Sequence, residues 1–157
     1  MSKIIDQRMT ARIEGDFVVF LIGLRINKWW KLHKWVPLMK TMPAMLKELQ
    51  SLPQEETGFL GVTGGSATLS VQYWRSFEHL EAYAKSQSHA HFPVWVDFNK
   101  RMKQARGDVG IWHETYLVKA GHYESVYSGM PPFGLGEAST LVPATGNRKD
   151  ARSRLQG

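Results

Sequence analysis

The chain has 157 residues, a net charge of +6, 43% hydrophobic and 22% charged residues, and no cysteine. This composition is typical of a soluble globular domain, and the missing cysteines exclude a disulfide scaffold, a thiolate nucleophile and a cysteine-ligated metal site. The longest apolar run, residues 17–24, is too short for a membrane-spanning helix, which needs about 20 residues. Without an apolar signal-peptide core near the N-terminus, we expect a cytoplasmic protein.

The positive charge is scattered rather than gathered in a nucleic-acid-binding motif. Part of it lies in the last 20 or so residues, where four cations face two acids: Arg148, Lys149, Arg152 and Arg154 against Glu137 and Asp150. We interpret the charge as a source of solubility and of attraction to an anionic small molecule. We expect no nucleic-acid partner and no stable membrane contact.

After an N-terminal arm, the first half of the chain predicts a strand, a helix and two more strands. Residues 17–26 are rich in β-branched and aromatic side chains, which indicates a buried strand. Apolar residues recur at helical spacing over 35–49, and Pro37 and Pro43 predict that this helix is kinked or begins late.

The next two strands are expected at 59–65 and 67–74, on either side of a glycine turn. In the second of them Val71 and Tyr73 alternate with Gln72 and Trp74, which predicts two different faces.

The second half predicts two helices and a long strand. Ser76 is a natural N-cap for a helix over 77–85, and Pro93 suits the first position of another helix that ends before Gly107. Residues 109–118 predict the last long strand, and 122–127 suggest a further short one. Residues 137–157 show no periodicity and are expected to be a flexible tail behind a single domain at 1–136.

The order β-α-β-β-α-β predicts an α+β fold of the ferredoxin-like type, an antiparallel sheet with helices on one face. The other face is left apolar, so we expect a homodimer in which a second copy covers it. The space between each sheet and its own helices is then the natural pocket for a small-molecule substrate.

Aromatic residues suggest what that pocket holds. Trp74, Trp95 and Trp112 lie on the third strand, the helix that starts near Pro93 and the last strand, with Phe98 on the same helix stripe as Trp95. We expect the three tryptophans to converge as walls for a flat apolar ligand. The alternative is that they are ordinary core residues.

Two histidines, His89 and His91, precede Pro93. The proline argues against a strand that would put both imidazoles on one face, and a closed zinc or non-haem iron site lacks a nearby carboxylate. A single imidazole is enough for a haem iron, and Arg75, Lys28 or Lys31 are candidate partners for haem propionates. The alternative is that both histidines only cap a helix junction.

His113 and Glu114 are neighbours on the last strand and are expected to face opposite sides of the sheet. The segment KWWKLHKW, residues 28–35, combines tryptophan with lysine, as membrane-surface segments do. We interpret it instead as a lip over the pocket mouth.

Five segments, RINKWWKLHKW, YWRSFEHLEAYA, HAHFPVWVDFN, GIWHETY and YESVYSGMPPFGLG, together resemble a bacterial and fungal family of unknown function. This family is often labelled monooxygenase-like, after a member in the fumagillin cluster, and belongs to the dimeric α+β barrel superfamily. The resemblance covers about residues 12–136. It implies a ferredoxin-like homodimer and an oxidoreductase.

A weaker similarity links the chain to haem-containing aldoxime dehydratases. It implies that His91 binds the iron and that His113 and Glu114 lie in the corresponding WHE strand. The turn at 128–131 has no histidine where those enzymes carry a catalytic one, which argues against dehydration by the same mechanism, but a haem-dependent dehydratase related to them stays an alternative.

Three functions are therefore expected to compete. The first is a haem-binding oxidoreductase that uses His91 as metal ligand, with His113, Glu114 and His89 as catalytic candidates and Trp74, Arg75, Trp95, Phe98 and Trp112 around the cofactor. The second is a cofactor-independent monooxygenase of an aromatic substrate with a histidine base. The third is a haem or small-molecule carrier without turnover.

Overall fold

A computed structural model describes residues 2–64, 66–88 and 91–156. Its main element is a four-stranded antiparallel sheet of order β3-β4-β2-β5. The strands are β2 (Phe17–Ile26), β3 (Phe59–Thr63), β4 (Ser70–Trp74) and β5 (Val109–Val118). The two long strands β2 and β5 pair over their whole length, from Phe17 opposite Val118 to Ile26 opposite Val109. This strand order confirms the predicted ferredoxin-like α+β fold.

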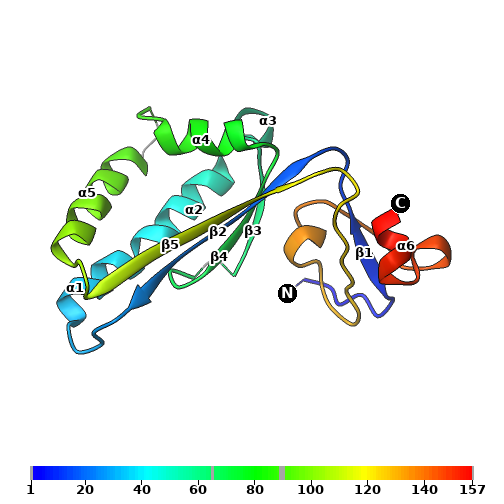
Figure 1. Cartoon of the computed structure of the whole chain (residues 1–157), viewed down its shortest axis with the longest axis horizontal. Helices are drawn as coiled ribbons and strands as arrows, with labels where there is room; N and C mark the ends of the chain where they lie inside the picture. Colours follow the sequence, from blue (N-terminus) through cyan, green and yellow to red (C-terminus); the bar gives the residue numbers. More distant parts are fainter. Residues whose placement is uncertain (1, 65, 89–90, 157) are drawn as a thin grey trace.

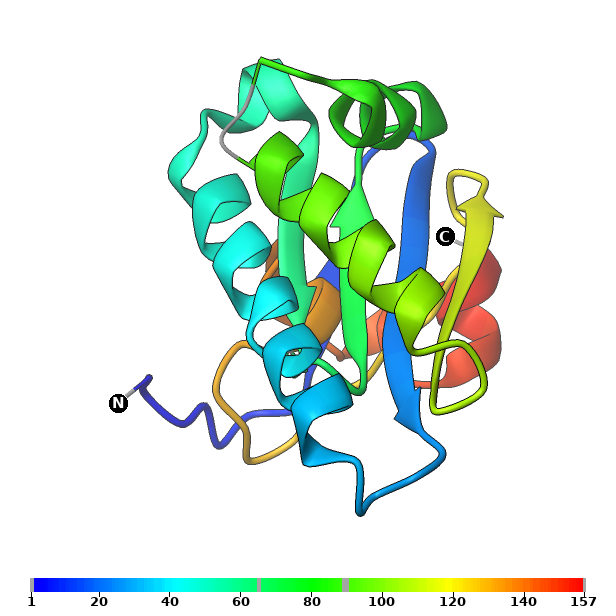
Figure 2. The same cartoon turned by 90° about the vertical axis from the view of Figure 1, so that its left-hand side faces the viewer.

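Four helices cover one face of this sheet (Figures 1 and 2). They are α1 (Leu32–Met39), α2 (Thr41–Ser51), α4 (Phe77–Lys85) and α5 (His91–Gln104), and a short α3 (Gln54–Thr57) lies in the expected loop. The predicted effect of proline is confirmed, because the helix is interrupted at Lys40 and α2 begins near Pro43, which lies in its first turn. Pro37 lies inside α1. Ser76 caps α4 as predicted, and its hydroxyl accepts from the backbone of His79.

The core lies between this sheet face and the helices. Alternate residues of β2, among them Ile22 and Leu24, point toward the helices, where Leu38, Met42 and Phe98 are buried. In β4 the same face carries Ser70, Gln72 and Trp74, as the alternation predicted. This face therefore holds both the core and the candidate site.

A second unit joins the two ends of the chain (Figure 1). Strand β1 (Met9–Arg12) pairs antiparallel with β6 (Thr140–Pro143), next to η1 (Gly134–Gly136), η2 (Gly146–Arg148) and α6 (Ala151–Gln156). Residues 137–157, which the sequence predicts as a flexible tail, thus contain a short strand and two short helices, and their flexibility stays a prediction. The short strand expected at 122–127 is absent, since that segment contributes only an isolated bridge between Tyr127 and Met9.

The sheet face away from the helices is only partly covered. Leu135 packs there against Phe17 with Tyr73 and Val19 beside them, so the end unit closes one part of the face (Figure 2). Farther along β5, Tyr116 is 52% exposed. No helix in the described part of the chain is long and apolar enough to cross a membrane.

Candidate functional site

A small cavity of about 120 Å³ lies between the sheet and its helices, and we call it the helix-side cavity. Strands β2 and β4 form its floor, and α2, α4 and α5 form its walls. Its lining is almost wholly apolar and consists of Phe20, Ile22, Met42, Met45, Leu46, Leu49, Gln72, Trp74, Leu80, Tyr83, Ala84 and Trp95. Apolar cavities of roughly 150 Å³ bind benzene, so this space is close to the size of one aromatic ring.

Gln72 places a polar side chain with a fixed orientation in the floor of the helix-side cavity. Its side chain is buried, and its Oε1 accepts a hydrogen bond of 3.1 Å from the indole Nε1 of Trp74, which is 1% exposed. An indole nitrogen can only donate, so the amide atom that meets it must be the oxygen. The amide nitrogen of Gln72, a donor, is therefore left for other partners.

Tyr83 is the second polar residue in the lining. Burial raises the pKa of its phenol, and the charge of Glu48 raises it further. Tyr83 is therefore a neutral phenol at physiological pH, and the ring stacks obliquely on Trp74 with 5.8 Å between centroids. The cavity lining thus carries no formal charge, which favours an apolar ligand.

The wall from α5 consists of two stacked rings. Trp95 and Phe98 are nearly parallel, with 5.6 Å between their centroids. Trp95 is half-buried and lines the cavity, whereas Phe98 is fully buried in the core beneath it. Two of the three predicted tryptophan walls, Trp74 and Trp95, therefore meet at one site.

Trp112 does not join them. It pairs with Gly23, on the sheet face away from the helices, because the residues on either side of Gly23 are the ones that point into the core. The expected convergence of three tryptophans is corrected to two. The sequence left this one-residue register undetermined, and a shift by one residue exchanges the two faces of a strand.

His113 and Glu114 lie on opposite faces of the sheet, as predicted. His113 is on the helix side, exposed at the edge of the sheet, with its ring 5.7 Å from that of Phe20 in the cavity floor. Glu114 is on the other face, where it accepts a 2.7 Å hydrogen bond from Tyr116 and raises the pKa of that phenol. Only His113 is therefore next to the cavity.

The cationic partners proposed for haem propionates lie elsewhere. Arg75 donates to the backbone oxygen of Glu14 at 2.7 Å, beyond the end of β4. Lys28 and Lys31 both pair with Asp108, at 2.8 and 2.9 Å, and their hydrogen bonds lower the pKa of that carboxyl to about 2. These two lysines fasten the segment after β2 to the turn before β5.

The structure describes only part of the pair His89 and His91. His91 begins α5, four residues before Trp95, but its side chain and all of His89 lie outside the described part of the chain. Their roles stay predictions. Among the described residues, no group of three or more histidine, aspartate and glutamate side chains is placed to hold a metal ion.

Sequence reasoning missed Gln72 and the methionine and tyrosine walls, Met42, Met45 and Tyr83. A signal for Gln72 was present, because the alternation in β4 put it on the same face as Trp74. The α2 and α4 walls gave no such signal, since their apolar residues look the same whether they border a cavity or fill a core.

Comparison with known proteins agrees with the fold and with the predicted family. The chain is 28% identical over 180 aligned positions to the "Monooxygenase af470" of Aspergillus fumigatus, and the match covers all of this chain and 62% of that protein. The chain therefore spans about three fifths of that relative's length.

An aldoxime dehydratase in complex with butyraldoxime has a similar fold, with a TM-score of 0.64 at 14% identity over 88% of this chain and 43% of that chain. This likeness confirms the weaker of the two predicted similarities at the level of the fold. The family model described as Monooxygenase af470-like matches residues 17–135, from the start of β2 into η1. The chain therefore belongs to the Monooxygenase af470-like family.

Proposed function

We propose that this chain is a monooxygenase-like oxidoreductase that binds a small, mainly apolar organic substrate in the helix-side cavity. The observation that carries the proposal is the lining of this cavity, where apolar and aromatic side chains surround one oriented amide, that of Gln72. Such a lining recognises an apolar body with one hydrogen-bond acceptor. Family membership and the name of the fungal relative support an oxidation as the reaction.

We propose a reaction in which the substrate itself supplies the electrons. A phenol or enol becomes electron-rich enough to reduce dioxygen once it is deprotonated. When a methylene group next to such a ring becomes a ketone, one oxygen atom stays on carbon and the other leaves as water with the two methylene hydrogens. Four electrons pass from substrate to dioxygen, and no other reductant is needed.

Two residues have roles in this reaction. The amide nitrogen of Gln72 donates to the oxygen of the substrate and stabilises the anion that forms there, as an oxyanion-stabilising donor does. His113 is the base, because imidazole accepts protons near neutral pH and its ring lies against Phe20 at the cavity floor. Met42 and Met45 are flexible enough to let the cavity adapt to a larger ring system.

The described residues do not fit a haem at this cavity. Its volume of about 120 Å³ is well below the roughly 300–1,000 Å³ typical of pockets for larger ligands. Arg75, Lys28 and Lys31, expected to meet the propionates, are engaged elsewhere. Haem ligation by His91, expected from the sequence, is therefore the competing hypothesis, and we derive no step through it.

Oxygen uptake tests the proposal with anthrone, a three-ring compound whose enol form is a phenol and which has a reactive methylene group. We expect one ring to enter the cavity and Met42 and Met45 to move to admit more of the molecule. We expect purified protein to consume one dioxygen for each quinone formed, and Gln72→Leu to lower kcat/KM by about 10²-fold, as the loss of one oxyanion donor does. Gln50→Leu, on the exposed side of α2, is the matched control and should be silent.

The haem hypothesis is tested on the same protein. We expect no Soret band after haem addition and no effect of His91→Ala on oxygen uptake. A Soret band that His91→Ala abolishes would replace our proposal with a haem enzyme or a haem carrier. Binding of anthrone without oxygen uptake would instead leave a small-molecule carrier.

We also propose that the protein is a homodimer that buries the exposed part of β5. This edge strand is ten residues long and pairs only with β2 in the described structure. It exposes large apolar side chains on both faces, with Leu117 69% exposed and Ile111 41% exposed on one side, and Tyr116 on the other. A long apolar edge strand is prone to pairing with another chain, and a second copy removes that surface from water.

A further inference from the structure

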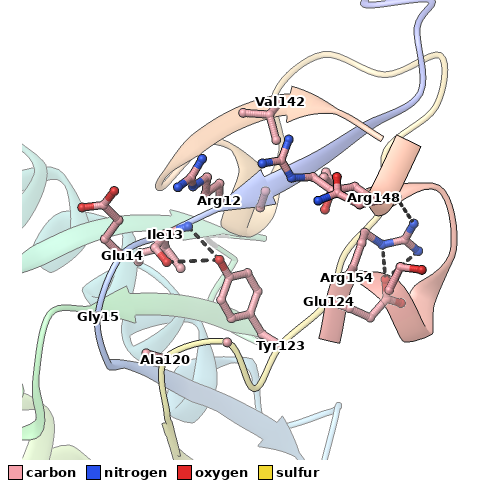
Figure 3. A pocket seen from close by; sticks show the side chains of 15 residues that line it. Arg12, Ile13, Glu14, Gly15, Ala120, Tyr123, Glu124, Val142, Arg148 and Arg154 are labelled. Carbon is pink, nitrogen blue, oxygen red and sulfur yellow. Dashed lines mark hydrogen bonds and ion pairs between the residues drawn. The ribbon is translucent and has the colours of Figure 1, made fainter. Parts of the chain in front are cut away.

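A second pocket of about 340 Å³, which shares no lining residue with the helix-side cavity, lies between β1 and the C-terminal elements (Figure 3). Its walls come from residues 10–15, 120, 121, 123, 124, 142, 147, 148, 153 and 154. Most of these residues lie outside the range 17–135 that matches the family. We call it the arginine pocket, because Arg12, Arg148 and Arg154 line it.

Arg154 is the fixed part of this pocket. Its side chain is 5% exposed, and its guanidinium meets Glu124 Oε2 through both Nε and a terminal nitrogen, each at 2.8 Å. Its other terminal nitrogen donates to the backbone oxygen of Arg148 at 2.9 Å (Figure 3). A buried charge held in this way is satisfied, so Arg154 and Glu124 neutralise each other and hold the backbone of Arg148 in place.

Arg12 and Arg148 are the two cations of this pocket that are available to bind a ligand. Arg12 extends from β1 and Arg148 from η2, so the two cations approach the pocket from different elements (Figure 3). Among the described residues, neither side chain has a carboxylate within ion-pair distance, and Glu124 is already taken by Arg154. The remaining acid in the lining is Glu14. Two available cations against one acid leave a positive pocket.

The rest of the lining is partly apolar and firmly held. Tyr123 ties the wall together, because its hydroxyl accepts from the backbone nitrogen of Ile13 at 2.8 Å and donates to the oxygen of the same residue at 3.1 Å. Ile13 and Val142 add apolar surface. A guanidinium pair beside apolar side chains suits an oxyanion that carries a small organic group.

We propose that the arginine pocket binds a small organic oxyanion, a carboxylate or a phosphate ester, through Arg12 and Arg148. Its volume lies at the lower end of the roughly 300–1,000 Å³ of ligand pockets, so the ligand is a small molecule and not a polymer. The site is separate from the helix-side cavity. It assigns a role to Arg148 and Arg154, two of the cations near the end of the chain.

Calorimetric titration of the full chain at low ionic strength tests this site, with sodium benzoate and phenyl phosphate as the two probes and sodium chloride as the blank. We expect saturable binding of at least one probe. Arg12→Gln and Arg148→Gln should each weaken it by about tenfold or more, since hydrogen bonds to charged groups are the strong ones. Arg152→Gln, an exposed position on α6 outside the lining, is the matched control, because it removes the same charge.

The comparison of variants decides the outcome. Binding that falls in Arg12→Gln and Arg148→Gln but not in Arg152→Gln supports the site, and the tighter probe distinguishes carboxylate from phosphate recognition. Equal weakening in all three variants reveals only general charge attraction and overturns the proposal. Absence of saturable binding by either probe overturns it as well. Far-ultraviolet circular dichroism of each variant checks that the fold is kept.

Discussion

The hydrogen bond between Trp74 and Gln72 makes a quantitative prediction. Gln72→Leu removes the acceptor but keeps a side chain of similar size, which leaves the indole nitrogen of Trp74 buried without its partner. An unsatisfied buried donor costs about 1–3 kcal/mol, so the variant should be less stable by about that amount. When both partners become apolar, the same change is nearly neutral, so Gln72→Leu should cost little in a Trp74→Phe background.

Urea unfolding of the wild type, the two single variants and the double variant measures this difference. The coupling free energy between the two positions should be about 1–3 kcal/mol, within the range found for residues in direct contact. Intrinsic tryptophan fluorescence and circular dichroism should give the same unfolding midpoints if unfolding is two-state. An equal cost of Gln72→Leu in both backgrounds would refute the hydrogen bond, and with it the orientation that aims the amide nitrogen of Gln72 at a substrate.

Three further predictions concern charge, backbone and assembly. Lys28 and Lys31 lower the pKa of Asp108 to about 2. The stabilisation that the Asp108 carboxylate gives should therefore be complete above about pH 4 and should be lost as the pH falls toward 2. Asp108→Asn should make the free energy of unfolding less dependent on pH over that interval. Gly58→Ala should destabilise more than Gly107→Ala, because both glycines have positive φ but only the first would bring a Cβ against a neighbouring side chain, and thermal melts compare the two. Tyr116→Lys should shift light-scattering mass from dimer to monomer, and an unchanged mass would exclude β5 as the interface.

The ferredoxin-like part of the fold was predictable because its local signals agree with one another. The strand at 109–118 and the helix at 77–85 were predicted with their observed bounds, since an apolar run or a serine cap marks each of them. The prolines at 37 and 43 predicted a helix that is kinked or begins near Pro43, and the structure has two helices, the second of which begins at Thr41 after the interruption at Lys40. Helix α5 begins two residues before Pro93, a small difference of the kind that helix ends commonly show.

The end unit was not predictable by the same reasoning. Strands β1 and β6 have four residues each, too few to show alternation, and they pair across almost the whole chain. Nothing in residues 140–143 indicates that residues 9–12 are their partner, because pairing over long sequence separation depends on tertiary context. The arginine pocket could not be predicted for the same reason, although the sequence shows a surplus of positive charge near the end of the chain.

The pairing of β1 with β6 has a consequence for the order of folding. The two strands must close a loop that contains the entire sheet and all of its helices, and contacts at such sequence separation form late because the closure costs entropy before any contact repays it. The arginine pocket exists only after that closure, since its walls come from both ends. An anion that binds there therefore selects chains whose ends have met, and it stabilises the last step of assembly by mass action.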